Sequence, residues 1–216
     1  MGRMRAKRNI PIRMERCHER WFDDPMLNKG HWREACGFTA DVPVWLEIGC
    51  GKGKFCTLMA QAHPEVLYIA VEKEPSVILA AIEKAHEMEL PNLFFIKGDA
   101  NLIENYFDKD EVDHMFINFC DPWTRQNKPK RRLTYRDFLT KYKSFLKPGS
   151  RLSFKTDNDD LFDFSLKEFE ESGFELTELT RDLHNSEYDK DNIRTEFEQQ
   201  FVDQGINIKR VTAVLK

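Results

Sequence analysis

Short apolar segments alternate with longer amphipathic ones along most of this chain, and this alternation restricts the possible folds more than any other feature. Strands separated by helices of about 10–15 residues, apolar throughout instead of alternating with polar residues, are typical of βαβ units. The sequence therefore predicts an α/β protein with a doubly wound, Rossmann-like, mostly parallel sheet between two helical layers, a three-layer sandwich. The predicted strands are residues 44–48, 67–71, 93–96, 114–119 and 151–155, and the predicted helices are residues 54–62, 76–89, 135–146 and 161–171.

The C-terminal part of the chain departs from this pattern. Residues 174–179 and 206–215 both look like strands. The segment between them has too little apolar periodicity to predict a helix. We therefore expect the sheet to end with an antiparallel C-terminal strand.

Charged residues are strongly segregated along the chain. Residues 1–16 hold six bases and one acid, and residues 125–132 hold five bases and no acid, whereas residues 157–200 hold 15 acids and four bases. Such segregation indicates a polyanionic partner on one side of the molecule. Residues 1–40 are predicted to form a basic arm and residues 41–216 one folded domain. The arm is expected to dock in part through its aromatic residues Trp21, Phe22 and Trp32.

Composition excludes several classes of protein. The 216 residues have a net charge of −4, which excludes a uniformly basic nucleic-acid coat. No apolar run approaches the roughly 18 residues that span a bilayer, and no apolar region follows the basic N-terminus as in a secretory signal. The five cysteines are odd in number and show no CxxC spacing. We expect reduced thiols, a cytoplasmic location, no metal site and no membrane contact.

A glycine-rich loop follows the first predicted strand directly. Gly49, Gly51 and Gly53 form a G-x-G-x-G pattern, and Glu72 ends the next predicted strand, where a doubly wound sheet places an acid for ribose hydroxyls. Dinucleotide sites favour G-x-G-x-x-G instead. Glu47, two residues before the loop, would repel a pyrophosphate but suits the ammonium or sulfonium of S-adenosylmethionine. A methyl donor is thus favoured over a nicotinamide dinucleotide, although Glu47 could also be a strand-end residue satisfied by backbone N–H groups.

Acidic residues also follow the third and fourth predicted strands. Asp99 is placed to accept from an adenine amino group or to cap a helix starting near Ala100. Asp121, Pro122 and Trp123 follow the fourth strand, where open α/β sheets bind ligands. The basic run behind them suits an acceptor held by its phosphates, most simply a nucleic acid. The candidate substrate-binding residues in this run are Arg125, Asn127, Lys128, Lys130, Arg131 and Arg132.

Several motifs together resemble those of bacterial tRNA (guanine-N7-)-methyltransferases. The resemblance spans about Arg3 to Gly205 and includes Leu46–Gly53, Asp121–Trp123, Lys130–Thr134, Phe154–Asn158 and Thr195–Glu198. It implies a class I enzyme that transfers a methyl group from S-adenosylmethionine to guanine 46 of the tRNA variable loop, leaving S-adenosylhomocysteine. It further implies cofactor contacts and tRNA contacts by separate sets of residues. The cofactor set is Glu47, Glu72, Asp99 and Asp121, and the tRNA set is Arg125, Asp157 and the segment from Thr195 to Glu198, with Thr195 and Glu198 as the predicted substrate-binding residues.

One departure from the family concerns the loop after Trp123. The family usually reads Asp-Pro-Trp-Pro-Lys, whereas this chain has Thr124 and Arg125. Arg125 keeps the positive charge but changes the hydrogen-bond geometry.

The expected chemistry places few demands on the enzyme. Guanine N7 holds a free lone pair, so catalysis is mainly orientation, and Asp121 is predicted to stabilise the charge that develops on the base. A methyltransferase acting on another RNA and a non-catalytic RNA-binding protein with the same fold remain alternatives. A monomer and a homodimer both fit the sequence.

Overall fold

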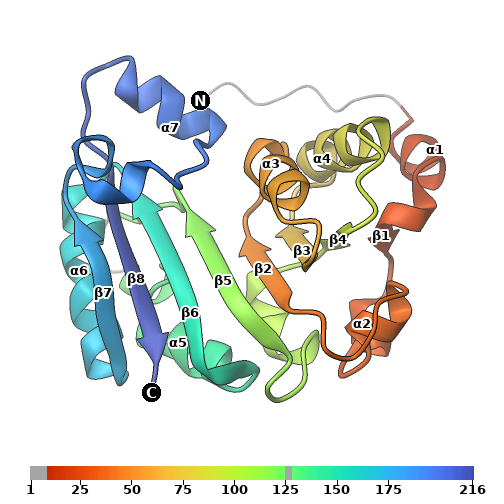
Figure 1. Cartoon of the computed structure of the whole chain (residues 1–216), viewed down its shortest axis with the longest axis horizontal. Helices are drawn as coiled ribbons and strands as arrows, with labels where there is room; N and C mark the ends of the chain where they lie inside the picture. The colour runs from red at the N-terminus through yellow and green to blue at the C-terminus, as the bar shows by residue number, and fades with distance from the viewer. Residues whose placement is uncertain (1–8, 125–127) are drawn as a thin grey trace.

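The computed structural model describes residues 9–124 and 128–216, and Arg125 and Asn127 lie outside this range. Its central feature is an eight-stranded sheet with the order β1-β4-β3-β2-β5-β6-β8-β7 (Figure 1). The strands are β1 (Trp21–Phe22), β2 (Val44–Ile48), β3 (Leu67–Glu72), β4 (Leu93–Lys97), β5 (Val112–Asn118), β6 (Leu146–Thr156), β7 (Phe174–Thr180) and β8 (Lys209–Leu215). The helices are α1 (Ile10–Glu15), α2 (Trp32–Ala35), α3 (Lys54–Ala62), α4 (Pro75–Glu87), α5 (Arg136–Lys143), α6 (Asp159–Glu171) and α7 (Glu196–Val202). Short 3₁₀ turns are η1 (His18–Arg20), η2 (Pro25–Asn28), η3 (Ala100–Asn105), η4 (Pro129–Arg131), η5 (Leu183–Asn185) and η6 (Glu187–Asp189).

Strand directions confirm the predicted fold class. Strands β1 to β6 pair in parallel, whereas β8 is antiparallel to both of its neighbours, β6 and β7. Strand order reverses between β2 and β5, since the chain runs outward from β2 to β3 and β4 and then returns to add β5 on the other side. This reversal opens a crevice at the carboxyl ends of the central strands, where ligands bind in folds of this type.

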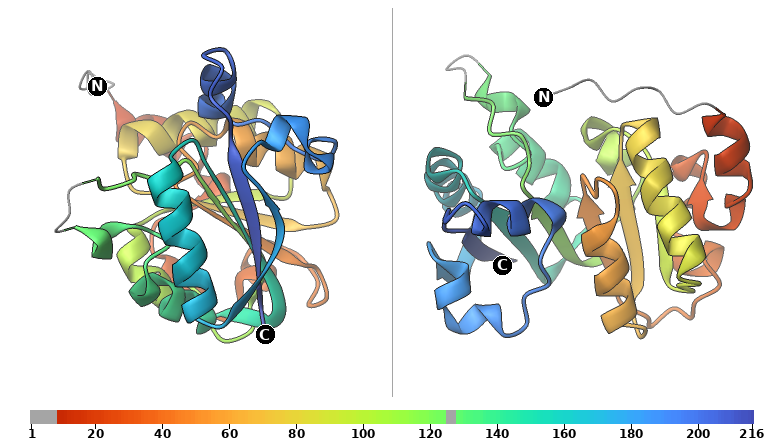
Figure 2. Two further views of the ribbon diagram at one scale, coloured as in Figure 1. Left: turned by 90° about the vertical axis from the view of Figure 1, so that its left-hand side faces the viewer. Right: turned by 90° about the horizontal axis from the view of Figure 1, so that it is seen from above.

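Helices cover both faces of the sheet, which confirms the three-layer arrangement. Helices α3 and α4 lie on one face, and α5 and α6 lie on the other (Figures 1 and 2). Because buried strands turn alternate side chains to opposite faces, the sheet has two cores. Tyr68 and Ala70 pack toward α3 and α4, whereas Ile69 and Val71 belong to the core on the α5 and α6 side.

Residues 9–40 pack against the rest of the protein. Strand β1 pairs in parallel with β4 at the edge of the sheet, and Arg13 of α1 forms an ion pair with Glu83 of α4 at 2.6 Å. Trp32 is fully buried and donates from Nε1 to the carbonyl of Tyr106 at 2.7 Å. The Glu111 carboxylate accepts from the backbone N–H groups of Gly30, Trp32 and Asp108. The buried side chains of Trp32 and Glu111 thus hold residues 9–40 against the rest of the protein.

Several elements differ from the prediction, among them β1, which was not predicted, and α5, which ends at Lys143 instead of Leu146. The strand predicted at residues 151–155 begins at Leu146, because Leu146 pairs with Val112 before the chain bulges through Pro148 and Gly149 and pairs again at Arg151. Helix α7 lies in the segment where no helix is predicted. It has only two turns, so apolar periodicity could not reveal it. No helix in the described ranges is long and apolar enough to cross a membrane.

Candidate functional site

A cavity of about 550 Å³ lies at the carboxyl ends of the central strands and is called the main cavity below. Its walls come from the strand ends of β2 to β6 and from α7, which lies above the ends of β5 and β6 (Figure 1). Its lining includes four of the predicted acids, Glu72, Asp99, Asp121 and Asp157. A fifth, Glu47, lines a smaller adjoining cavity that shares Gly49, Glu72 and Phe197 with the first. The fold thus gathers the acids that the sequence distributes over about 110 residues.

The glycine loop adopts backbone conformations that side chains disfavour. Gly49, Gly51 and Gly53 have φ angles of 80°, 59° and 82°. The N–H of Gly49 donates to the carbonyl of Val71 at 2.8 Å, which ties the loop to β3. Gly53 does not face the cavity, because a Cβ there would lie 2.6 Å from the Cβ of Ala81 in α4. Gly53 therefore supplies the close packing with a neighbouring helix, while Gly49 and Gly51 border the ligand space.

Glu47 is buried and only half satisfied. Its Oε1 accepts from Asn118 Nδ2 at 3.1 Å, whereas its Oε2 makes no hydrogen bond of normal geometry among the described residues and has the buried Tyr68 hydroxyl nearby. Burial raises the pKa of this carboxyl to about 7. A buried oxygen without a partner is unfavourable unless a ligand supplies one. Asn118 is absent from the predicted site, although a polar residue at the end of an apolar strand was a usable signal.

Glu72 and Asp99 lie side by side across the ends of β3 and β4. Glu72 accepts from the N–H groups of Gly51, Lys73 and Glu74 at 3.2, 2.8 and 2.9 Å. Asp99 accepts from Lys73 Nζ at 2.6 Å, and this hydrogen bond holds the pKa of Asp99 below its usual value. Asp99 also caps η3 through the N–H of Asn101, so the alternative capping role predicted for it is present. Lys73 was not predicted, and its exposed side chain shares Asp99 with any ligand that binds there.

Asp121 lies between two residues with unusual backbone geometry. Phe119 and Trp123 have φ angles of 52° and 44°, in the left-handed region that residues other than glycine rarely adopt. Asp121 is exposed and lines the main cavity. Arg132 secures the loop by donating from Nε to the carbonyl of Pro122 at 2.9 Å. Strain of this kind is concentrated at functional sites, where the surrounding structure compensates for it.

The basic run borders the mouth of the main cavity. Arg131 and Lys128 lie over the Trp123 ring, 4.9 and 5.9 Å from its centroid. Lys130 is exposed on η4. Arg132, in contrast, stacks on Phe164 at 4.3 Å and serves the protein's own structure. Within this run, Lys128, Lys130 and Arg131 are therefore the described bases most available to a polyanion.

The predicted residues Thr195 and Glu198 form the capping box that starts α7. The N–H of Glu198 donates to Thr195 Oγ1 at 2.9 Å, and the N–H of Thr195 donates to Glu198 Oε2 at 3.3 Å. Both residues are buried. The structure assigns them a structural role, and a contact of either with a substrate stays a prediction.

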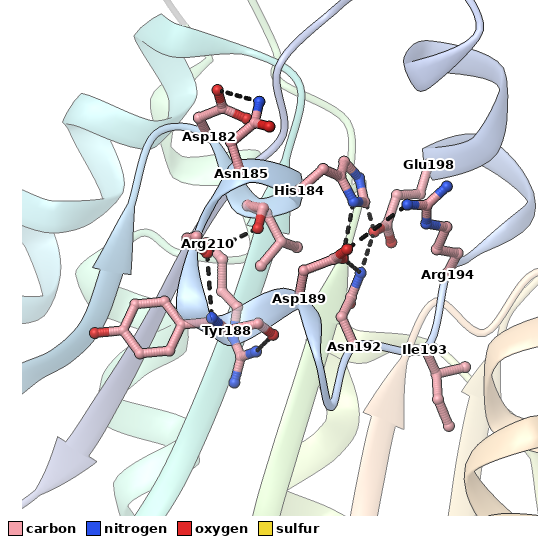
Figure 3. A network of polar contacts seen from close by, with 12 residues as sticks. Asp182, His184, Asn185, Tyr188, Asp189, Asn192, Ile193, Arg194, Glu198 and Arg210 are labelled. Carbon is pink, nitrogen blue, oxygen red and sulfur yellow. Dashed lines mark hydrogen bonds and ion pairs between the residues drawn. The ribbon is translucent and has the colours of Figure 1, made fainter.

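Glu198 of this capping box also belongs to a polar network with His184, Asp189 and Asn192 (Figure 3). Lys155 of β6 donates to Glu198 Oε2 at 2.8 Å, to Asn192 Oδ1 at 3.0 Å and to the carbonyl of Ile193 at 3.1 Å. His184 lies within 3.3 Å of Glu198 and contacts Asp189 at 2.9 Å. Lys155 was not predicted, although a lysine within an apolar strand signals a buried partner.

Helix α7 presents aromatic side chains to the main cavity. Phe201 stacks on Phe119 with ring centroids 5.8 Å apart, and Phe197 is 46% exposed at the cavity wall. Asp157, at the end of β6, lines the same wall, and its carbonyl accepts from Lys209 Nζ at 2.9 Å. Within the described ranges, no group of three or more potential ligands could hold a metal ion.

Known proteins resemble this chain over most of its length. A family model described as "Putative methyltransferase" matches residues 41–211. A tRNA (guanine-N(7)-)-methyltransferase of Clostridium acetobutylicum is 47% identical over 193 residues, which cover 89% of this chain and 90% of that protein. An enzyme with the same name from Brevibacillus brevis is 39% identical over 208 residues, covering 95% and 96%.

Solved structures share the fold at much lower identity. The 16S rRNA methyltransferase KamB has a TM-score of 0.62 at 15% identity, covering 81% of this chain and 88% of that one. A SAM-dependent methyltransferase from Aquifex aeolicus has a TM-score of 0.56 at 15% identity, covering 97% of this chain and 100% of that one. These likenesses concern the fold alone.

Proposed function

Because the chain belongs to the bacterial tRNA (guanine-N7-)-methyltransferase family, we infer that it transfers a methyl group from S-adenosylmethionine to N7 of a guanine in tRNA. Relatives of that name are 39–47% identical over 88–95% of the chain. The proposed target is guanine 46 in the variable loop, as the resemblance to this family implies. We propose the cytoplasm as the compartment, since the tRNA substrate is found there.

The observation that carries the cofactor assignment is the half-satisfied carboxylate of Glu47. A cation suits the unpartnered Oε2, which lies beside the glycine loop, and S-adenosylmethionine carries both an ammonium and a sulfonium group. We propose that Glu47 binds the charged end of the cofactor, Glu72 its ribose hydroxyls and Asp99 its adenine amino group. When bound, the cofactor supplies an electrophilic methyl group.

We propose that Asp121 acts by electrostatic stabilisation. Guanine N7 is already nucleophilic, so no group needs to remove a proton from it. The protein has to hold N7 in line with the methyl carbon and the departing sulfur. The base becomes cationic as the bond forms, and the exposed Asp121 carboxylate on the cavity wall would offset this charge.

The basic residues at the mouth of the main cavity support tRNA as the partner. Lys128, Lys130 and Arg131 lie beside the loop that carries Asp121. Contacts of such residues with phosphates hold a nucleic acid without reading its sequence, and they weaken as salt rises. We propose that they hold the tRNA backbone while the target base enters the cavity.

Incubation of the protein with S-adenosylmethionine and unmodified tRNA tests the proposal, with the nucleosides then identified by nuclease digestion and mass spectrometry. We expect 7-methylguanosine with the wild-type protein and none with Asp121→Ala. Single-turnover rates of Asp121→Asn test the electrostatic role, because an undiminished rate would exclude it. A different methylated nucleoside would mean another RNA target, and cofactor binding without methylation would favour a non-catalytic RNA-binding protein.

A further inference from the structure

Phe197 is unusual among the large apolar side chains of this protein, because it is exposed on the wall of the proposed active site. It lines both the main cavity and the smaller cavity beside the glycine loop. Phe201 lies four residues later, on the same face of α7, and its ring is stacked on Phe119. Among the described residues, no ring pair includes Phe197. The side chain is 46% exposed, so part of its ring is available to a ligand.

Two contacts hold α7, the helix that carries Phe197, to the sheet. The buried ion pair between Lys155 and Glu198 joins the first turn of α7 to β6. The stack of Phe201 on Phe119 joins its second turn to the end of β5. A site held by such packing keeps its geometry better than a side chain on a free loop. The exposed ring is consequently presented at a fixed place.

Trp123 also lines this cavity, but two cations contact its ring. Arg131 lies 4.9 Å from the ring centroid, and Lys128 lies 5.9 Å from it. A base that stacked where one of these cations lies would have to displace it. Phe197 is the better platform of the two.

The proposed chemistry requires a platform of this kind. The lone pair of guanine N7 lies in the plane of the ring, so the methyl group must arrive in that plane. Both faces of the base stay free, and contact with one face can hold the plane in line with the methyl group. An aromatic face also attracts positive charge, which develops on guanine as N7 is methylated.

We propose that Phe197 is the stacking platform for the target guanine, a role that rests on the proposed function. Single-stranded nucleic acids are recognised in this way by aromatic side chains. Stacking would bring the base to the cavity wall formed by α7, and it would stabilise the cationic product ring more than the neutral substrate ring.

Steady-state kinetics of position-197 variants test the role. Phe197→Ala should lower kcat/KM for tRNA by about 5- to 100-fold, the range for removal of one base-stacking contact. Phe197→Tyr should restore activity, whereas Phe197→Leu should not, because leucine has no aromatic face. The affinity for S-adenosylmethionine should change less than twofold. Ile206→Ala is the matched control, since Ile206 is also exposed and lies just beyond α7 but lines neither cavity.

A double-mutant cycle, which combines Phe197→Ala with an altered tRNA, tests the contact between Phe197 and the base directly. The second tRNA carries an abasic site in place of the target guanine, and affinities are measured with S-adenosylhomocysteine present. Removal of the base should weaken binding by the wild-type protein severalfold and binding by Phe197→Ala hardly at all. Additive losses, or a loss of cofactor affinity equal to the loss of rate, would overturn the proposal. A wild-type protein that makes no 7-methylguanosine would instead refute the proposed function.

Discussion

Replacement of Lys155 by methionine should detach α7 from the sheet. Lys155 and Glu198 are 5% and 0% exposed, and the three hydrogen bonds of the ammonium group reach only this part of the chain. Methionine keeps the length and most of the volume of the side chain but removes its charge. The substitution therefore leaves the Glu198 carboxylate buried without its cation.

The expected loss in the free energy of unfolding is about 3–5 kcal/mol, as for other buried ion pairs that lose one partner. The attraction across 2.8 Å is roughly 6 kcal/mol at an effective dielectric constant of about 20, before the cost of desolvating both ions is subtracted. Glu198 keeps a hydrogen bond from Asn192 Nδ2 at 2.7 Å, which favours the lower end of the range. If only α7 opens, the loss appears locally and not in global unfolding.

Urea denaturation and hydrogen exchange together measure both outcomes. We expect lower stability or faster amide exchange across residues 184–202 in Lys155→Met. The double variant Lys155→Met, Glu198→Leu should recover at least half of the loss, because an apolar pair of similar volume can replace a buried ion pair at little cost. A single-variant effect below about 1 kcal/mol without faster exchange, or a double variant less stable than Lys155→Met, would refute this reasoning.

Three further predictions concern titration and packing. Burial raises the pKa of Glu47 to about 7, and S-adenosylmethionine needs the ionised carboxylate, so its affinity should rise by up to about tenfold per pH unit from pH 5 to 7 and level off above. Calorimetry should show an affinity that does not change with pH for Glu47→Gln. The same result for the wild-type protein would contradict the assignment. Burial lowers the pKa of His114 to about 3, so between about pH 6.5 and 3 this imidazole is protonated in the unfolded chain but neutral in the folded protein. The free energy of unfolding should therefore decrease as the pH is lowered through this range, by up to about 1.4 kcal/mol per pH unit from this group. His114→Gln should make the pH dependence of urea denaturation shallower, and an unchanged slope would argue against a neutral His114. Gly53→Ala should destabilise the protein by about 2–4 kcal/mol in thermal unfolding, since it adds a clash with Ala81 to an unfavourable φ. Gly173→Ala is the control, because Gly173 also has a positive φ but has open space around it, and it should cost only about 1–2 kcal/mol. Equal losses would contradict the packing role of Gly53.

Local patterns were sufficient to predict most of the sheet. Each central strand is a short apolar run, and each long helix repeats its apolar residues every three or four positions, so both can be recognised within a stretch of about ten residues. Strand β1 escaped prediction because its two residues carry no period, and its pairing with β4 depends on residues more than 70 positions away. The bulge at Pro148 and Gly149 likewise depends on pairing with β5.

The roles of individual site residues depend on contacts between distant segments. Sequence patterns were sufficient to predict the order of strands and helices, the glycine loop and the acids at the strand ends, because strand ends of a parallel sheet share one edge. Three features follow from the folded chain instead: Gly53 packs on α4, Thr195 and Glu198 are buried in a capping box, and Phe197 faces the cavity. The partners Lys155 and Glu198 are 43 residues apart, and no periodicity links them. Apolar patterns predict local structure because burial repeats along an element, whereas polar partners are chosen by the folded geometry.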